Sequence, residues 1–353
     1  MVASTKTSPG NFFEDFQIGQ AIVHATPRTI TEGDVSLYTA LYGPRFAIHS
    51  SDTFAMDLGL EAAPVDDLLV FHVVFGKTVP DISLNAVANL GYASGIFGAQ
   101  VYPGDTLSTT SEVIGRKENS NGKTGVIYVR STGRNQRGET VVEYVRWVMV
   151  QKRDPASPAP EPVVPELADA VAAADLVVPV GLDLAAYDTA LAGSGHFWDD
   201  YAVGEKIDHV DGVTIEEAEH MLATRLYQNT ARVHFNQHLA KDGRFGRRLM
   251  YGGHIISLAR SISFNGLGNA FRIAAVNAGT HVAPTFAGDT IYAWSEVTDK
   301  MEIPGRDDMG ALRLRTIACK DCDCADFPDR DSEEKHDPAV ALDFDYTVLM
   351  PRT

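Results

Sequence analysis

Apolar side chains recur at helical spacing in two places along the chain. In residues 253–264, Ile255 is followed by Ile256, Leu258, Ala259 and Ile262. These residues stand one, three, four and seven positions after Ile255, so they share one broad face of a helix. Residues 68–78 form an equally apolar run that stops before Pro80, which cannot continue a helix. The pattern therefore predicts two helices that are buried rather than amphipathic.

Runs rich in β-branched and aromatic residues follow each predicted helix. They cover residues 126–131 and 140–150 in the first part of the chain, and residues 311–320 and 339–350 in the second. The first pair is joined across Gly138, which suits the turn of an antiparallel hairpin. A long helix with an antiparallel sheet laid over it is an α+β layer arrangement.

Two shorter helices are predicted from capping signals. Thr29 and Thr214 each stand three residues before a glutamate, the spacing at which a hydroxyl and a carboxylate satisfy each other's backbone amides. After Thr214 the apolar residues again have helical spacing, at Ile215, Ala218, Met221, Leu222 and Leu226. We expect a helix capped by each threonine.

The two parts of the chain repeat each other. Residues 13–19 return as residues 198–204, and the same displacement of 185 residues aligns Thr29 with Thr214 and His49 with His234. Residues 89–91 and 102–106 return as residues 277–279 and 286–290. We therefore expect two diverged copies of one domain, at residues 11–153 and 196–353. The linker, residues 154–195, begins with a proline-rich stretch, which fixes an extended backbone, and continues as an Ala-, Val- and Leu-rich segment able to pack on a domain.

Composition narrows the possible partners. The chain of 353 residues is 44% hydrophobic and has a formal net charge of -17, which argues against a nucleic-acid partner because phosphate binding needs clustered cations. Residues 1–11 are polar and do not resemble a secretory signal, and no stretch approaches the roughly 20 apolar residues that span a bilayer. We expect a cytoplasmic protein that binds no membrane. No glycine-rich nucleotide fingerprint follows a strand, so no cofactor is expected.

All three cysteines lie within six residues, at Cys319, Cys322 and Cys324. A metal site is one interpretation, but no second cysteine pair completes a tetrahedral set, and no histidine stands at ligand spacing to them. The acidic stretch that follows, residues 321–337, favours a solvated variable loop and no metal.

Three segments carry a resemblance to a known family: residues 71–86 (FHVVFGKTVPDISLNA), residues 226–236 (LYQNTARVHFN) and residues 251–254 (YGGH). Each copy resembles a hot-dog domain of the MaoC dehydratase type, in which a curved antiparallel sheet wraps a central helix. Over nearly its full length, the chain is similar to the mesaconyl-CoA hydratases, a family of tandem double hot-dog proteins. The resemblance implies a lyase that adds water reversibly to mesaconyl-CoA, giving β-methylmalyl-CoA, in the ethylmalonyl-CoA pathway or the 3-hydroxypropionate cycle. A homo-oligomer is expected.

The family signature, Asp-x-Asn-Pro-x-His, is altered in this chain. His234 occupies the histidine position, while Asn229 stands where the family has aspartate. Hydration of an enoyl thioester needs a proton acceptor for water and a donor for the carbon beside the carbonyl. Asparagine can orient water but cannot carry a proton, so the acid/base work would fall on His234. In the first copy the equivalents are His49 and Pro44, which predicts a degenerate site.

The resemblance also implies an oxyanion-binding amide at Gly252 or Gly253, where a predicted helix begins with unpaired amides. For the free carboxylate of the substrate Arg232 is the first candidate, because arginine's planar fork suits a carboxylate. Its competitors are Arg45, Arg225, Arg247 and Arg248. Three other functions stay open: a hydratase for plain 2-enoyl-CoA esters, an acyl-CoA thioesterase, and a non-catalytic subunit that binds acyl-CoA.

Overall fold

The computed structural model describes residues 6–353, and ten strands within this range form one antiparallel sheet. The first five residues, part of the polar start discussed above, lie outside the described residues. The first half supplies β1 (Ala21–Thr29), β2 (Ala86–Phe97), β3 (Thr106–Glu118), β4 (Thr124–Arg134) and β5 (Thr140–Gln151). The second half supplies β6 (Lys206–Thr214), β7 (Arg272–His281), β8 (Thr290–Ile303), β9 (Arg306–Lys320) and β10 (Val340–Pro351).

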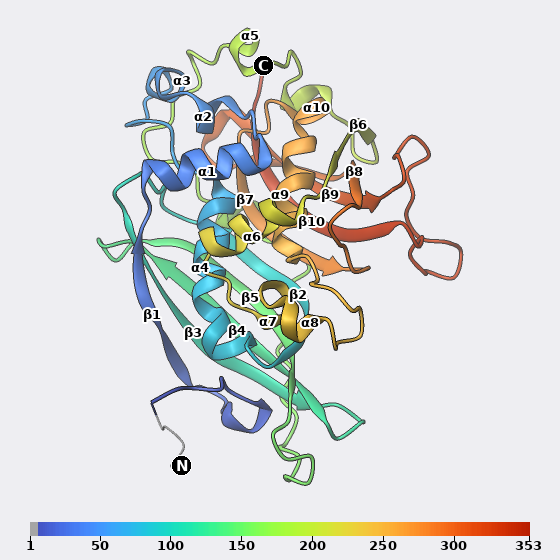
Figure 1. Ribbon diagram of the computed structural model, residues 1–353. Coiled ribbons are helices and arrows are strands. Elements are labelled where there is room, and N and C mark those ends of the chain that lie inside the picture. Colours follow the sequence, from blue (N-terminus) through green and yellow to red (C-terminus); the bar gives the residue numbers. More distant parts are fainter. Residues whose placement is uncertain (1–5) are drawn as a thin grey trace.

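The two halves meet in the middle of this sheet (Figure 1). The strand order is β1-β3-β4-β5-β2-β7-β10-β9-β8-β6, so the second half repeats the order of the first in the opposite direction. At the junction β2 pairs with β7, and Tyr92 lies opposite Gly279. The repeat in the sequence is thus a pseudo-twofold repeat in space, and the predicted α+β double hot-dog architecture is confirmed.

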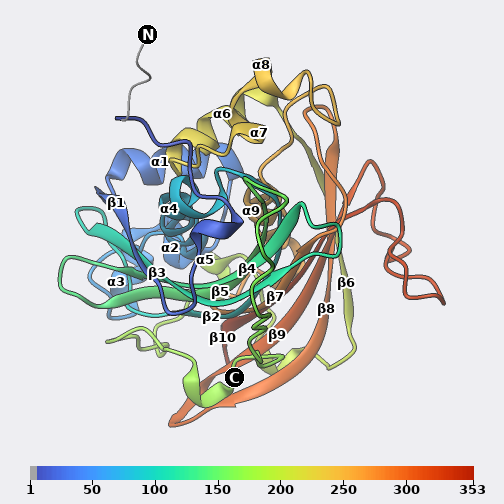
Figure 2. The same cartoon turned by 90° about the horizontal axis from the view of Figure 1, so that it is seen from below.

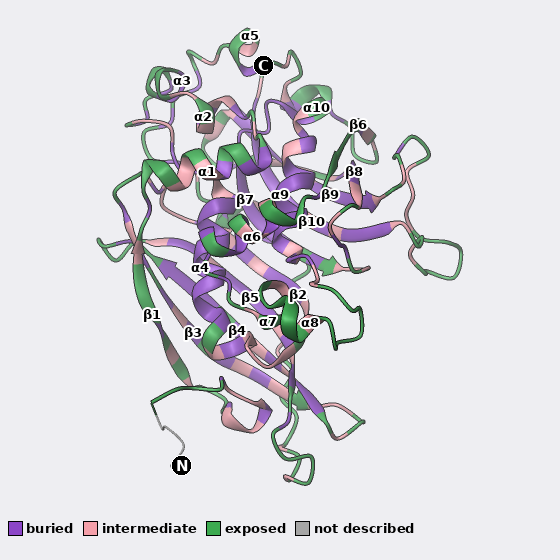
Figure 3. Cartoon of the chain, in the orientation of Figure 1, coloured by how far each residue is buried: buried purple, intermediate pink, exposed green. Residues whose placement is uncertain are grey.

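The helices lie on one face of the sheet, whose strands curve beneath them (Figure 2). Among the described residues they are α1 (Glu32–Tyr42), α2 (Ala47–Ser50), α3 (Asp52–Asp57), α4 (Asp67–Thr78), α5 (Thr189–Ala192), α6 (Glu217–Leu226), α7 (Arg232–Phe235), α8 (Gln237–Ala240), α9 (Gly252–Ile262) and α10 (Phe264–Leu267). The two buried helices predicted from apolar spacing are α4 and α9, and they are covered along almost their whole length (Figure 3). None of the helices in residues 6–353 is both long and apolar enough to cross a membrane.

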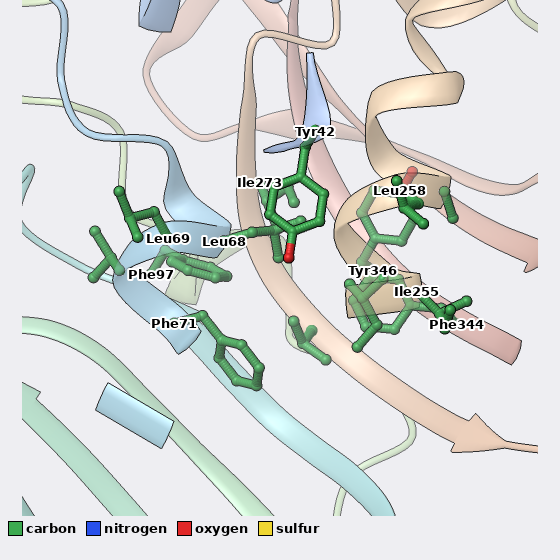
Figure 4. Close-up of a cluster of buried hydrophobic side chains, with 14 of the residues drawn as sticks. Tyr42, Leu68, Leu69, Phe71, Phe97, Ile255, Leu258, Ile273, Phe344 and Tyr346 are labelled. Carbon is green, nitrogen blue, oxygen red and sulfur yellow. The ribbon is translucent and has the colours of Figure 1, made fainter. Parts of the chain in front are cut away.

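A single apolar core joins the two halves. It takes Leu68 and Phe71 from α4, Ile255 and Leu258 from α9, and the ring of Tyr42 from α1, which lies between the two helices in Figure 4. Burying one such side chain contributes roughly 1.5–3 kcal/mol. The core therefore holds the halves together as well as stabilising each one.

Helix α4 also fixes the loop that follows α6. A Cβ atom on Gly76 would lie 1.8 Å from the backbone oxygen of Tyr227, so the helix can approach the loop this closely only because residue 76 has no side chain. The loop from Tyr227 to Asn229 therefore rests directly on the helix of the other half.

The capping threonines were predicted wrongly, although the helices themselves are present. Thr29 and Thr214 end strands, and their hydroxyl groups lie 2.7 and 2.9 Å from those of Thr106 and Thr290 on the neighbouring strands. The cap of α1 is Thr31, whose hydroxyl accepts from the amide of Asp34, and α6 begins after Glu216. Strand pairing extends the backbone through each threonine, so the helices start two residues later.

The second part of the linker packs on the body of the protein. Leu176, Leu182 and Leu184 are buried in one apolar cluster with Phe271 of the second half. The amide of Val171 donates to Oδ1 of Asn277, at 2.9 Å. This segment therefore covers the outer side of the junction between the halves.

The acidic residues 321–337 form the largely exposed loop that was expected, but two of the three cysteines are buried. Cys319 lies on β9, and both Cys319 and Cys324 are buried beside Trp294 and Val340. Nearby Asp329 binds Arg315, with 2.6 Å between oxygen and nitrogen. The segment is ordered by an apolar cluster beneath it and by ion pairs with the sheet, which a count of its charges does not reveal.

Candidate active site

His234 lies on the short helix α7, above the start of α9. Its Nδ1 donates to the backbone oxygen of Leu249 at 2.8 Å, which leaves Nε2 as the proton acceptor of a neutral imidazole. Burial lowers the pKa of His234 to about 4, although the hydrogen bond to Leu249 opposes the shift. The ring is therefore neutral at pH 7, and Nε2 donates to or accepts from no group in residues 6–353.

Asn229 is buried at the base of the same loop. Its Oδ1 accepts from the amide of Ala231 at 3.2 Å, and its own amide donates to the backbone oxygen of Thr224 at 2.9 Å. Side-chain Nδ2 has no acceptor among the described groups. The residue therefore shapes the turn into α7 and keeps one polar donor free.

The first residues of α9 present two unpaired amides. Neither Gly252 nor Gly253 donates a backbone hydrogen bond within the described part of the chain, as expected for the first turn of a helix. Rings lie directly against both: a Cβ on Gly252 would be 2.2 Å from the His281 ring, and one on Gly253 would be 2.4 Å from the Tyr251 ring. Only glycine allows this packing, and the helix dipole favours negative charge at the amides.

Five histidines gather around this helix start, and we call them the histidine cluster: His72, His220, His234, His254 and His281. The His220 ring centroid lies 6.1 Å from that of His234 and 5.7 Å from that of His254. Burial lowers the pKa of each member, to about 2 for His220, about 3 for His72 and about 4 for the others. The cluster is therefore uncharged at pH 7.

Hydrogen bonds fix the rings of the cluster. The amide of Tyr251 donates to Nε2 of His220 at 2.9 Å, which holds the start of α9. Tyr227 donates to the hydroxyl of Tyr42, which lies 2.8 Å from Nδ1 of His254. Since Tyr42 belongs to the first half, both halves build this site.

His281 brings β7 into the site. Its Nε2 lies 3.3 Å from the hydroxyl of Tyr92, on the adjacent strand β2. Burial, and then the neighbouring His234, lower its pKa. His281 is thus a second neutral imidazole beside His234, and it was not among the residues predicted from the sequence.

The structure separates Arg232 from this cluster. Its side chain is exposed, and it donates to Oδ1 of Asn85 at 3.0 Å and to the backbone oxygen of Pro9 at 3.1 Å. Of the competing arginines, Arg248 pairs with Glu217 at 2.7 Å. Arg45 stacks on Phe264, and Arg225 and Arg247 are exposed. Of these arginines, only Arg248 acts on the histidine cluster, because its charge helps to lower the pKa of His220.

The equivalent place in the first half is filled. His49 repeats the bond of His234, because its Nδ1 donates to the backbone oxygen of Pro64 at 3.0 Å, fifteen residues later in each case. Its Nε2, however, lies 3.6 Å from Asp67, the first residue of α4. The cavity beside them measures about 10 Å³, the space of one water molecule.

Residues 6–353 hold no group of three or more His, Cys, Asp or Glu side chains able to bind an ion. What the geometry provides is a neutral imidazole base beside two free amides. A base and an anion-binding pair of amides suit the addition of water to a double bond conjugated with a carbonyl, where negative charge develops on oxygen.

Sequence reasoning missed His220, His254 and His281 as parts of the site. They stand on three separate elements and share no local motif. One signal for the site was present in the sequence, namely the aligned positions at which the two halves carry chemically different residues. The displacement of 185 residues sets Gly252 against Asp67 and Tyr251 against Asp66, and the alignment of residues 277–279 with residues 89–91 sets His281 against Ala93.

Comparison with known proteins agrees with this architecture. A solved structure of a MaoC domain dehydratase from Chloroflexus aurantiacus superposes with a TM-score of 0.97 and is 72% identical, covering 99% of this chain and 100% of its own. The double hot-dog protein Rv0216 of Mycobacterium tuberculosis superposes with a TM-score of 0.77 at 24% identity, and covers 98% of this chain and 99% of its own. The second likeness supports the fold alone.

Sequence comparison defines the family. The chain is 72% identical over 349 residues to the β-methylmalyl-CoA dehydratase of Chloroflexus aurantiacus, covering 99% of each. It is 62% identical over 349 residues to the mesaconyl-CoA hydratase of Cereibacter sphaeroides, covering 98% of this chain and 100% of that protein. The sequence model of the family described as mesaconyl-CoA hydratase matches residues 2–328. The chain therefore belongs to the mesaconyl-CoA hydratase family.

Proposed function

We propose that this chain is a hydro-lyase that adds water reversibly to mesaconyl-CoA and gives β-methylmalyl-CoA. The observation that carries the proposal is the neutral His234, with Nε2 free and Nδ1 held by Leu249, beside the unpaired amides that begin α9. The names of the relatives from Chloroflexus aurantiacus and Cereibacter sphaeroides support the same reaction and the same acyl-CoA substrate.

In this mechanism Nε2 of His234 accepts a proton from water while the water oxygen bonds to the β carbon of the enoyl thioester. The electron pair of the double bond moves to the thioester oxygen, and the amides of Gly252 and Gly253 stabilise the resulting enolate. The imidazolium then returns the proton to the α carbon, so water is added with no net change in the enzyme. Asn229 orients the water through its free amide group.

Asn229 gives the proposal its specific form. The general MaoC-type signature that this loop resembles has aspartate at this position, whereas this chain has Asn229, so a second proton carrier is missing from the loop. A single histidine can serve both steps because its protonated form, with a folded pKa of about 4, is a strong acid toward the enolate carbon.

The test is the absorbance of the enoyl-thioester band after mesaconyl-CoA is added to the purified protein. The proposal expects the band to decrease toward an equilibrium value, and to reappear when β-methylmalyl-CoA is the starting compound. Release of free thiol would indicate a thioesterase, and turnover of crotonyl-CoA alone a plain enoyl-CoA hydratase. Binding without any spectral change would indicate a non-catalytic subunit. The expected homo-oligomer and cytoplasmic location stay predictions.

A further inference from the structure

One buried arginine in the first half has no anion to balance it. Three arginines are buried among the described residues. Arg272 lies 3.8 Å from Asp67, and Arg260 interacts electrostatically with Asp66 and Asp67. Arg146, on β5, is fully buried and forms no ion pair within residues 6–353; the groups that act on its charge are the neutral Tyr92, Tyr144 and Tyr251. A buried charge without a counterion is costly, so this one requires an explanation.

The groups around Arg146 are neutral and incompletely satisfied. Its Nη2 donates to the hydroxyls of Thr78 and Ser83, each at 2.8 Å, and its Nη1 lies 3.4 Å from Oδ1 of Asn89. Two buried donors here have no hydrogen-bond partner, Nε of Arg146 and Nδ2 of Asn89. The hydroxyl of Tyr144 completes no hydrogen bond either, although Thr78 and Ser131 lie close enough to lower its pKa against the effect of burial. All three can donate, so the missing partner is an acceptor, and beside a guanidinium it is an anion.

Arg146 lies one aromatic layer away from the histidine cluster. Across the sheet it pairs with Tyr92, whose hydroxyl lies 3.3 Å from Nε2 of His281. On the helix side, its guanidinium lies 4.3 Å from the Phe75 ring. The Phe75 and Tyr251 ring centroids are 5.6 Å apart, and those of Tyr251 and His234 are 5.7 Å apart.

We propose that Arg146, with Asn89 and Tyr144, binds the free carboxylate of the acyl group during the reaction. The inference rests on the proposed function, because mesaconyl-CoA carries this carboxylate on the β carbon, where water adds. A planar guanidinium with a free Nε suits a carboxylate, which accepts two parallel hydrogen bonds. Holding the carboxylate fixes the β carbon with respect to His234, and the site then selects dicarboxylic acyl groups over those with a neutral end.

Burial lowers the pKa of Arg146 in the unliganded protein. A carboxylate bound there would offset the free-energy cost of burying the guanidinium charge. The fold has already removed water from the guanidinium, so this part of the desolvation takes place before the substrate binds. This assignment also replaces Arg232 with a residue that is buried and faces the same core as the histidine cluster.

The experiment compares two ligands that differ only at the carboxylate. In tiglyl-CoA a methyl group replaces the carboxylate of mesaconyl-CoA, and calorimetry gives the Kd of each ligand for the wild type and for Arg146→Gln. To prevent turnover, the comparison is made in the His234→Ala background, so the reference protein is His234→Ala and the test protein is His234→Ala with Arg146→Gln. We expect the Kd for mesaconyl-CoA, divided by the Kd for tiglyl-CoA, to rise by about 100-fold when Arg146 is replaced, because a buried charged hydrogen-bond pair is lost. Arg146→Lys should lose less, since it keeps the charge.

Two further variants keep the inference testable if Arg146→Gln does not fold. Tyr144→Phe removes one donor that completes no hydrogen bond in the fold, so it should fold normally and shift the ratio several-fold in the same direction. Arg232→Gln tests the competing assignment. An unchanged ratio in Arg146→Lys and Tyr144→Phe, or a similar rise of the ratio in Arg232→Gln, would overturn the inference. Failure of the proposed function would give a different result, because the wild type would then not hydrate mesaconyl-CoA at all.

Discussion

Asp67 stands in the first half where Gly252 stands in the second, at the first position of the buried helix. The carboxylate of Asp67 lies 3.6 Å from His49 and 3.8 Å from Arg272. The equivalent position in the second half has no carboxylate and lies beside the free amides of Gly252 and Gly253. A carboxylate at this point repels an enolate oxygen and fills its place. We therefore expect one site for an acyl thioester in the chain, and calorimetry should give one CoA ester bound per chain.

Replacing Asp67 separates stability from catalysis. Burial opposes ionisation, but His49, Arg272 and the amide of Ile273 outweigh it and hold the pKa of Asp67 below its usual range. Asp67→Asn leaves Arg272 buried without an anion, so we expect the free energy of unfolding to fall by about 3 kcal/mol. Urea denaturation at pH 7 measures it, and kcat/KM for mesaconyl-CoA should stay unchanged. The exposed Asp211→Asn is the matched control, expected within about 0.5 kcal/mol of the wild type.

In the wild type this contribution should be complete above the usual pKa of aspartate and disappear as the pH falls through the lower folded value. An Asp67→Asn protein whose stability matched the wild type at pH 7 would contradict the ion-pair account.

Removing the imidazole of His234 should abolish most of the turnover. For His234→Gln we expect kcat for mesaconyl-CoA hydration to fall by about 100- to 10,000-fold, while the Kd of the CoA ester changes little. In the wild type the folded pKa of about 4 predicts that kcat holds from pH 8 to about pH 5 and falls below that. A rate that fell already through pH 6.5 would show a histidine with an ordinary pKa instead.

The histidine cluster should make the fold sensitive to acid. Each member has a folded pKa of about 4 or lower, whereas an unfolded histidine titrates near 6.5. The unfolded chain therefore binds more protons below pH 6.5, and stability falls from there toward pH 4, by up to about 1.4 kcal/mol per pH unit for each ring.

His254→Gln should reduce this slope by the share of one ring, measured by urea denaturation between pH 4.5 and pH 7. His238→Gln, at an exposed position, serves as the control and should leave the slope as it is. Equal slopes for His254→Gln and the wild type would argue against a neutral, buried His254.

Gly253 should tolerate no side chain. A Cβ atom there would lie 2.4 Å from the Tyr251 ring and 2.5 Å from the His72 ring, both of which are buried. We expect Gly253→Ala to lower the free energy of unfolding by about 1–3 kcal/mol and to lower kcat, because the amides of α9 shift. Gly33→Ala, in helix α1, has its nearest neighbour at 3.5 Å and should be neutral or stabilising. Thermal unfolding and the absorbance assay test both variants together.

The buried helices were the most predictable elements because their signal is local. Apolar spacing places α9 within two residues of its observed end and locates α4, and the repeat anticipates the pairing of like halves. Helix starts were less predictable, since Thr29 and Thr214 satisfy the capping pattern but are held in strands by Thr106 and Thr290. Tertiary pairing decided between two locally acceptable conformations.

The candidate site was predictable only where it has a motif. His234, Asn229 and the two glycines lie in short recognisable segments, whereas His281 and Tyr92 meet only because β2 pairs with β7. The choice of Arg232 followed from its closeness to His234 in sequence, which says nothing of the direction in which its side chain points. Arg146 stands 88 positions before His234, and the pairing of β5 with β2 and of β2 with β7 places it one aromatic layer from the histidine cluster.

The continuous sheet limits how a substrate can enter. Rotation of one half against the other would break the backbone pairing of β2 with β7, so the molecule has no hinge at its pseudo-twofold junction. Movement must come from segments outside the sheet. Helices α7 and α8, which carry the exposed apolar side chains Val233, Phe235 and Leu239, are such a segment beside His234. If the thioester enters past these two helices, as we expect, His234 moves with them, because it lies on α7.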